Sequence, residues 1–193
     1  LVRSRGLGDV YKRQVWSERT GGEAETEDGL VKNVVSDKFR GSLYSKILDA
    51  DSAYDEIWTY GLQKDDAFGS KDCTVTIDEK QQLDSIYDDE MLQKKDKYAY
   101  FLSGNYGQVH IQNQKAASKA KGKNILIIKD SFANSFVPFV TQDYENIYMV
   151  DLRYYNGDMK SYLQEHNITD VLVLYNISNF ISDRNLHKLT GGI

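Results

Sequence analysis

The stretch Gly122-Lys-Asn-Ile-Leu-Ile-Ile-Lys-Asp-Ser131 decides how this chain should fold. Its four consecutive aliphatic residues, 125–128, are typical of a strand that is buried on both faces of a sheet. A polar Lys-Asp-Ser sequence follows, and residues 131–140 then form a short helix candidate. Pro138, the only proline of the chain, is tolerated there because it lies near the helix start. The stretch therefore predicts a buried strand that leads directly into a helix.

Two further apolar runs follow at helix-length intervals. Residues 146–152 and 170–175 are expected to be strands, the second of them buried, and residues 157–166 between them have the spacing of an amphipathic helix. Residues 179–189 form a terminal helix candidate. Strands separated by helical crossovers predict a βαβαβ unit, with a parallel sheet and right-handed connections.

The part of the chain before this unit has a weaker pattern. Short β-like runs occur at 30–35, 54–60 and 73–77, and the weak helical spacing over 80–97 predicts one or two short helices. Residues 98–102 and 108–111 are expected to be strands around a turn. We therefore expect residues 15–120 to be an irregular, β-rich part of the domain, and residues 121–193 to be an α/β core unit that carries a serine at its first strand end.

The first fourteen residues differ from the rest in charge. Their cations are Arg3, Arg5, Lys12 and Arg13, opposed only by Asp9, whereas the whole chain has a net charge of −5. The segment resembles translated sequencing-adapter read-through, although a genuine basic arm is the alternative. We expect residues 1–14 to be disordered and the chain to be a C-terminal fragment, and we leave the segment out of the fold prediction.

Composition excludes several classes of protein. The chain has 193 residues, of which 40% are hydrophobic, so it is too apolar to be intrinsically disordered. An acidic chain without a basic block predicts no nucleic-acid partner. A single cysteine, Cys73, rules out an intramolecular disulfide, and three histidines leave little material for a metal site. No Gly-rich nucleotide motif is present, so we expect neither a cofactor nor a metal.

The polar residues at the strand ends are the candidate site. In an open parallel sheet, ligands bind beyond the carboxyl ends of the strands, where residues 129–131, 151–155 and 175–179 should converge. Ser131, at the start of a helix, is the candidate nucleophile, and Asn176 is the candidate donor to an oxyanion. The alternative interpretation is that Ser131 only caps the helix and Asn176 lies in a turn.

A serine nucleophile needs a base, and the sequence offers one uncertain pair. Asp183 and His187 are four residues apart and would share one face of a helix, so they are the alternative orienting carboxylate and base. The simpler interpretation is an exposed terminal helix. His166 fits a favourable charge at a helix end, and His110 lies in a strand-like segment without an evident partner.

Four separated segments carry a family resemblance. Residues 34–46, 94–105, 122–139 and 147–155 resemble, in the same order, segments of the DHHW family of bacterial proteins. That family is similar to SGNH-type hydrolases and to polysaccharide O-acetyltransferases of the alginate-modification type. The resemblance implies an α/β fold, namely an SGNH- or flavodoxin-like parallel sheet with a βαβαβ C-terminal half and an irregular β-rich inserted region.

The resemblance also implies a chemistry. It implies a Ser-His-Asp mechanism on acetyl esters of a polysaccharide or other acetylated glycan, at the bacterial cell surface or otherwise outside the cytoplasm. Ser131 matches the family's nucleophile position, and Asn176 falls where SGNH enzymes place an oxyanion-hole asparagine. Arg153 and Tyr154 are implied substrate contacts, and Asn105 lies in a matching family segment and is assigned to substrate binding.

The Asp-His-His-Trp motif that names the family is absent from this chain. In the family it lies upstream of the segment that matches residues 34–46, so we expect the catalytic Asp and His to be upstream and the isolated chain to be inactive. A membrane partner would act through that same upstream part. Two other classes stay open: a non-catalytic carbohydrate-binding or scaffold protein, and a receiver-like signalling domain that would use Asp130 and Asp151.

Overall fold

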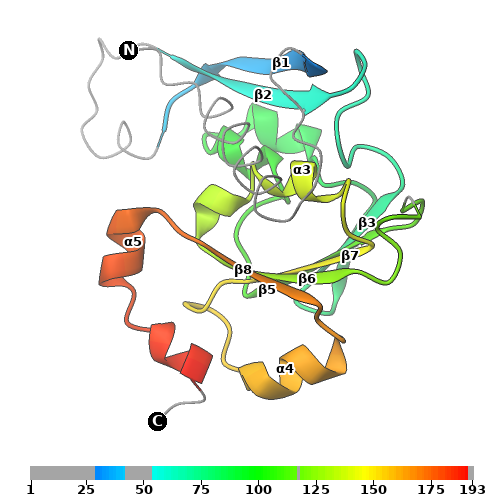
Figure 1. The fold of residues 1–193 in the computed structure, drawn as a ribbon. Coiled ribbons are helices and arrows are strands. Elements are labelled where there is room, and N and C mark those ends of the chain that lie inside the picture. Colours follow the sequence, from blue (N-terminus) through cyan, green and yellow to red (C-terminus); the bar gives the residue numbers. More distant parts are fainter. Residues whose placement is uncertain (1–28, 42–53, 117, 191–193) are drawn as a thin grey trace.

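The computed structural model describes residues 29–41, 54–116 and 118–190, which form a six-stranded sheet and a separate two-stranded hairpin (Figure 1). Residues 1–28, which include the adapter-like segment, lie outside the described residues. The strand order in the large sheet is β4-β3-β5-β7-β6-β8. The strands are β3 (Cys73–Ile77), β4 (Gln81–Leu83), β5 (Gln108–Asn113), β6 (Asn124–Lys129), β7 (Asn146–Val150) and β8 (Asp170–Leu174).

The βαβαβ unit of the C-terminal half is confirmed. β6 pairs in parallel with β7 on one side and with β8 on the other, so the chain leaves β6 in one direction and later returns to its other edge. This order makes the carboxyl end of β6 a topological switch point, the place where open α/β sheets bind ligands. Residues 129–131 lie at that end.

The sheet as a whole is mixed rather than parallel, which corrects the prediction. β5 pairs with β7 in antiparallel orientation, and β3 pairs antiparallel with both β5 and β4. The buried residues of β3 alternate with partly exposed ones along the strand. Such alternation is typical of antiparallel strands that pack on one face only, whereas β6 is buried on both faces.

One local prediction before the core unit was wrong. Residues 98–102 are not a strand, because 3₁₀ helix η3 (Lys97–Tyr100) begins there, after Asp96 accepts a hydrogen bond from the Tyr98 N–H. Residues 80–97 hold one short helix, the 3₁₀ helix η2 (Asp89–Gln93), which follows β4 and which Asp88 caps in the same way. Both aspartates satisfy free N–H groups at a helix start and thus fix where each short helix begins.

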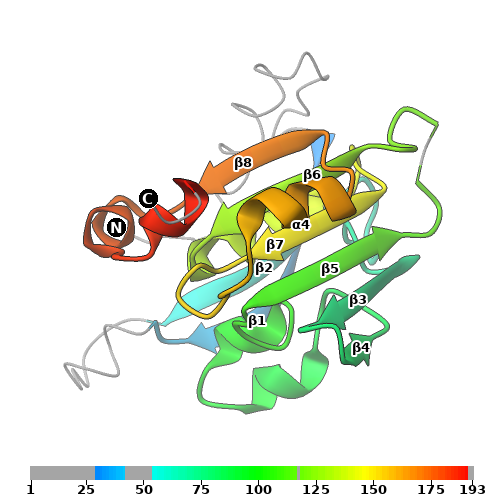
Figure 2. The same ribbon diagram turned by 90° about the horizontal axis from the view of Figure 1, so that it is seen from below.

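Helices cover the two faces of the parallel strands. α4 (Met159–Glu165) packs on the face that presents Leu126 and Ile128. The short helices η4 (Ser131–Ala133) and α3 (Val137–Val140) pack on the opposite face, against Ile125 and Ile127. Seen from below, α4 lies over β6 and β7, whereas no helix lies in front of β5 and β3 (Figure 2).

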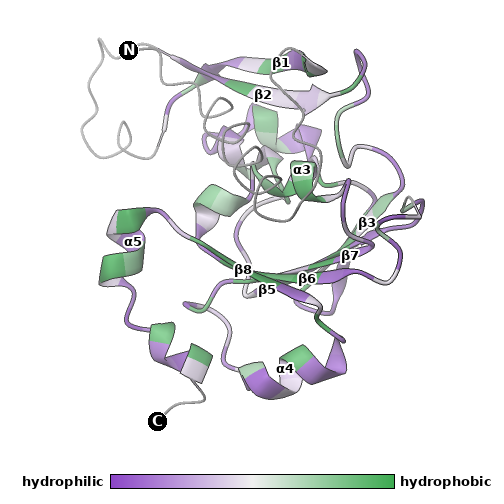
Figure 3. Cartoon of the chain, in the orientation of Figure 1, coloured by the Kyte–Doolittle hydropathy of each residue, from purple (hydrophilic) through white to green (hydrophobic). Residues whose placement is uncertain are grey.

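The C-terminal part differs from the prediction in two ways. β8 is an edge strand of the described sheet rather than a buried strand, with Val171 and Val173 exposed by 52% and 47%. The expected helix over 179–189 is broken into α5 (Ile177–Ser182) and 3₁₀ helix η5 (Leu186–Thr190). α5 is strongly hydrophobic in Figure 3 although its apolar side chains are largely exposed.

The hairpin covers the helices on the η4 side of the sheet. β1 (Val31–Phe39) pairs antiparallel with β2 (Asp55–Gly61), and the Phe39 and Tyr98 rings lie 6.5 Å apart. Tyr60 lies 5.6 Å from the Phe139 ring of α3. The hairpin therefore packs against η3 and against α3, which belongs to the segment that follows β6. Among the described helices, none is both long and apolar enough to cross a membrane.

The core makes a direct prediction about stability. Ile127 in the centre of β6 is fully buried, so Ile127→Ala should lower the free energy of unfolding by about 2–5 kcal/mol through lost burial and the cavity left behind. Val171→Ala, at an exposed position of β8, should change it by no more than about 0.5 kcal/mol. Urea unfolding followed by circular dichroism measures both values. Equal losses would contradict the assigned core.

Candidate functional site

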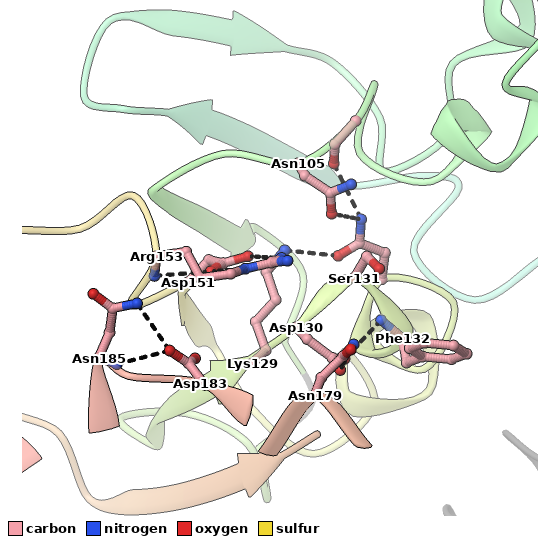
Figure 4. Close-up of polar contacts among 12 residues, drawn as sticks. Asn105, Lys129, Asp130, Ser131, Phe132, Asp151, Arg153, Asn179, Asp183 and Asn185 are labelled. Atoms are coloured by element: carbon pink, nitrogen blue, oxygen red, sulfur yellow. Dashed lines mark hydrogen bonds and ion pairs between the residues drawn. The ribbon is translucent and has the colours of Figure 1, made fainter. Parts of the chain in front are cut away.

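A buried carboxylate organises the carboxyl ends of β6 and β8. Asp130 is 1% exposed, and its Oδ1 accepts a hydrogen bond from the Phe132 N–H at 2.9 Å. Its Oδ2 accepts from Nδ2 of Asn179 at 2.7 Å (Figure 4). The same oxygen accepts from the Asn176 N–H at 2.9 Å. Asp130, and not Ser131, is therefore the cap of η4, which corrects the capping alternative.

The backbone of Ser131 is fixed while its hydroxyl is available. Its carbonyl oxygen accepts hydrogen bonds from the Tyr98 hydroxyl at 2.8 Å and from the Asn134 N–H at 3.3 Å. The residue is half-buried, and its hydroxyl forms no hydrogen bond with any residue that the structure describes. η4 is a single 3₁₀ turn, so the predicted helix over residues 131–140 is divided between η4 and α3.

A buried lysine next to this turn was missed by the sequence reasoning. Lys129 is fully buried at the end of β6, and its Nζ donates to Oδ1 of Asn134 at 2.9 Å. Nδ2 of Asn134 then donates to the Gly104 carbonyl oxygen and to Oδ1 of Asn105, both at 3.1 Å. A lysine that directly ends an aliphatic strand at a switch point is the signal that could have identified it.

This chain of hydrogen bonds has a fixed direction. An ammonium group can only donate and a backbone carbonyl can only accept, so Lys129 and Gly104 together determine how the Asn134 amide is oriented. Oδ1 of Asn105 must then accept from Asn134. The NH₂ group of Asn105 is consequently left to donate to another partner, beside the turn that carries Ser131.

Two acidic and two basic groups meet at the ends of β6 and β7. Asp151 is fully buried and holds Arg153 in a bidentate pair, with Nε–Oδ1 and NH2–Oδ2 distances of 2.9 and 2.6 Å. Burial lowers the pKa of Lys129 to about 8, against the attraction of Asp151 and Asp130. The hydrogen bonds to Asp151 raise the pKa of Arg153. The pairing offsets part of the cost of removing these charges from water.

A cavity of about 290 Å³ opens at this edge of the sheet. Its lining includes Asp130, Arg153, Asn179 and Asp183. The guanidinium of Arg153 thus borders the cavity while Asp151 restrains it. Arg153 also lies 5.4 Å from the ring of Tyr154, which is 58% exposed. The sequence-predicted convergence of the three strand ends is therefore present in the fold.

The other sequence-predicted residues lie in different surroundings. Oδ1 of Asn176 accepts from the Ser178 N–H and caps α5, so the oxygen of this side chain is already used. Asp183 follows the last residue of α5, and its Oδ1 accepts from the backbone and side chain of Asn185. His187 contacts the Arg184 carbonyl oxygen at 2.7 Å through Nδ1. The helix that would place Asp183 and His187 on one face is interrupted.

His110 and His166 lie on the α4 side of the sheet, away from the turn after β6. Their rings both lie 4.4 Å from the ring of Tyr148. No histidine in the described ranges therefore forms a hydrogen bond with Ser131. Within those same ranges, no group of three or more His, Cys, Asp or Glu side chains could hold a metal ion.

Comparison with known proteins fits this geometry. Residues 62–150 match the family model described as DHHW protein. This segment of the chain is therefore similar to DHHW family proteins. A DHHW family protein from Eubacterium siraeum superposes with a TM-score of 0.71 at 19% identity, over 97% of this chain and 61% of that one. No curated protein matches the sequence.

PatB1 from Bacillus cereus has the same fold. Its structure with a sulfonyl adduct matches this chain with a TM-score of 0.67 at 23% identity, covering 92% of this chain and 59% of PatB1. A second PatB1 structure gives a TM-score of 0.65 at 25% identity, with coverage of 93% and 60%. The chain thus spans about three fifths of the length of these proteins.

The hydrogen bonds of Asp130 should be measurable in stability. Asp130→Ala leaves two backbone N–H groups and the Asn179 amide without their acceptor, so we expect the free energy of unfolding to fall by at least about 3 kcal/mol. The exposed Asp84→Ala is the matched control and should stay within about 0.5 kcal/mol of wild type. Chemical unfolding compares them, and a neutral Asp130→Ala would refute the assigned role.

Burial of Lys129 should make stability depend on pH. Because the folded pKa is lowered from 10.5 to about 8, the unfolded chain binds a proton between these values that the folded chain lacks. The unfolding free energy of wild type relative to Lys129→Met should therefore rise from pH 8 towards pH 10.5 and stay level below pH 8. Urea unfolding across pH 6–10 measures this difference, and Lys123→Met, at an exposed position, should show no such rise.

Proposed function

We propose that this chain is part of an enzyme that transfers or hydrolyses acetyl groups on carbohydrate, with Ser131 as its nucleophile. The observation that carries the proposal is the turn after β6. Asp130 and Tyr98 fix its backbone at the switch point, while the Ser131 hydroxyl is left without a partner among the described residues. A nucleophile held in this way meets the substrate with little loss of conformational freedom.

The comparison with PatB1 supports the nucleophile. Sulfonyl groups form stable adducts with activated nucleophilic side chains, and PatB1 has been solved with such an adduct on a fold like this one. In the reaction that we propose, the Ser131 oxygen attacks the acetyl carbonyl carbon. Its proton passes to the histidine expected upstream, which then protonates the departing sugar oxygen.

The second half of the reaction restores the serine. A hydroxyl of the acceptor sugar, or water in an esterase, attacks the acetyl–serine ester while the histidine takes its proton. The proton then returns to the Ser131 oxygen as the ester bond breaks. Each half forms a tetrahedral oxyanion that needs a hydrogen-bond donor.

The side-chain NH₂ group of Asn105 is better oriented than that of Asn176 to donate a hydrogen bond to that oxyanion. The Asn134 bridge uses the oxygen of Asn105 and leaves its NH₂ group to donate. Asn176 uses its side-chain oxygen to cap α5, and its backbone N–H is taken by Asp130. We therefore assign Asn105 as the principal donor and Asn176 as the secondary one. Arg153, which lines the cavity, and the exposed Tyr154 beside it are proposed as substrate contacts.

We base the proposed substrate, cellular location and membrane partner of this protein on its family resemblance. We propose a polysaccharide or another acetylated glycan as substrate, an extracytoplasmic location, and a membrane partner bound through the segment expected upstream. A non-catalytic glycan-binding role is the second candidate. It is favoured by the finding that no described histidine contacts Ser131, and it predicts glycan binding without covalent labelling by a fluorophosphonate.

A kinetic assay distinguishes the roles proposed for Ser131, Asn105 and Asn176. The chain extended by its native upstream sequence is assayed for release of p-nitrophenol from p-nitrophenyl acetate. We expect Ser131→Ala to reduce the rate to background and Asn105→Ala to lower kcat by about 10²–10³-fold with little change in KM, as for other oxyanion donors. The matched variant Asn176→Ala should lose less.

Unchanged activity in Ser131→Ala would rule out this serine as the nucleophile. A larger loss in Asn176→Ala than in Asn105→Ala would reverse the two assigned donors.

A further inference from the structure

A second cavity lies on the opposite face of the sheet from Ser131. Its volume is about 360 Å³, within the range of about 300–1,000 Å³ usual for small-molecule sites. It lies beside α4, over the part of β5 and β3 that has no helix in front of it (Figure 2). Its lining includes Glu79, Gln108, His110, Tyr148, Tyr162 and His166.

A chain of amides fixes the proton position on His110. Nδ2 of Asn124 donates to the backbone carbonyl oxygens of His166 and Asn167, at 3.0 and 3.2 Å. Oδ1 of Asn124 therefore accepts from Nδ2 of Asn146 at 3.0 Å, and Oδ1 of Asn146 lies 3.0 Å from Nε2 of His110. Because carbonyl groups only accept, the direction of every bond is set, and Nε2 of His110 must carry the hydrogen.

The other ring nitrogen of His110 is consequently an acceptor. Burial lowers the pKa of this histidine, which outweighs the opposing effect of the Asn146 hydrogen bond, so the ring stays neutral near pH 7. Nδ1 then carries a lone pair and has no hydrogen-bond partner among the described residues. The ring is held in place by stacking on Tyr148, with 4.4 Å between centroids and a 3° interplanar angle.

Further acceptors line the cavity, together with hydroxyl groups of Thr76, Tyr148 and Tyr162 that can donate or accept. Gln108 donates its Nε2 to the Glu79 carboxylate at 2.8 Å and so leaves its own oxygen free to accept. No lysine or arginine lines the cavity, so a phosphate or carboxylate would meet only the repulsion of Glu79. The rings of Tyr162 and His166, 4.3 Å apart and inclined by 61°, add an angled, largely apolar wall. A fitting ligand therefore combines several hydroxyl groups, which can donate to the acceptors, with an apolar face.

We propose that this cavity is a binding site for a neutral sugar ring, whose hydroxyls donate to Nδ1 of His110 and to Glu79 and whose C–H face packs against Tyr162 and His166. A pyranose combines several hydroxyl donors with an apolar face, which is the combination that this lining requires. The site is on the opposite face from the Ser131 turn, so it needs no chemistry at that serine.

Long-range ¹H–¹⁵N NMR of the imidazole nitrogens tests the proposal on the unmodified chain. The spectrum should show His110 protonated at Nε2 with a pyridine-type Nδ1. Addition of neutral oligosaccharides, namely cellotetraose, maltotetraose and chitotetraose, should shift Nδ1 of His110 in at least one case and leave His187 unshifted. A proton on Nδ1, or no shift with any of the three, would overturn the proposal.

Variants test the two named acceptors. His110→Phe keeps a ring against Tyr148 but removes Nδ1, and Glu79→Gln removes the charge at nearly constant shape. For the sugar that binds, each should weaken binding by roughly tenfold or more in isothermal titration calorimetry, the effect expected for one hydrogen bond lost at a ligand. The control His187→Phe should bind as wild type does.

If either variant unfolds, the NMR experiment on the unmodified chain still tests whether the cavity binds a sugar. Ser131→Ala should bind the sugar with unchanged affinity, so a failure of the proposed enzyme activity and a failure of this site are distinguishable. Preference for a cationic probe such as choline, a quaternary ammonium ion, over all three sugars would contradict the assigned ligand class.

Discussion

The hydrogen bonds of the Asp130 carboxylate hold the candidate site together. A buried carboxylate is costly to remove from water unless donors surround it, and Asp130 receives three, from Phe132, Asn176 and Asn179. One of these donors lies in the turn after β6, and two lie after β8 or in α5. The group therefore fixes, at a single point, the turn that carries Ser131 and the segment that follows the neighbouring strand.

A second set of buried groups determines which atoms the site presents. Lys129 fixes the Asn134 amide, and through it Asn105, while Asp151 restrains Arg153 at the cavity edge. Replacing buried ionic groups by apolar ones is often neutral or stabilising in proteins, so such groups are weak evidence for stability alone. Here they fix the orientation of the Asn105 amide and of the Arg153 guanidinium.

The sequence predicted those parts of the structure that depend on local pattern. The aliphatic run of 125–128 fixed β6 at its observed limits, and its polar ending placed Ser131 at the switch point. Strands β3 and β5 were expected, but their antiparallel pairing was missed because partner choice depends on contacts distant in sequence. The break after Ser182 was missed for a similar reason, since Asp183 takes its hydrogen bonds from Asn185 and thereby ends the helix.

The sequence predicted where the candidate site lies, but it did not predict the hydrogen bonds that connect its residues. Lys129 is unusual because its side chain is fully buried, which only the folded structure shows. Asn105 joins the site through its hydrogen bond with Asn134, which lies 29 residues away in the sequence. The same holds on the other face of the sheet, where the proton position of His110 depends on Asn146 and Asn124. These chains of hydrogen bonds connect residues from separate helices, strands and loops. The spacing of residues within one segment of the sequence therefore cannot predict them.

The central claim is that Ser131 is the reactive hydroxyl of this edge of the sheet. Treatment of the chain, extended by its native upstream sequence, with phenylmethanesulfonyl fluoride followed by peptide mapping in a mass spectrometer tests it most directly. The account predicts one sulfonyl group, attached to Ser131, with the nearby Ser135 unmodified because its hydroxyl and N–H contact Tyr98. An adduct on Ser135 or on another residue, or no adduct at all, would contradict it.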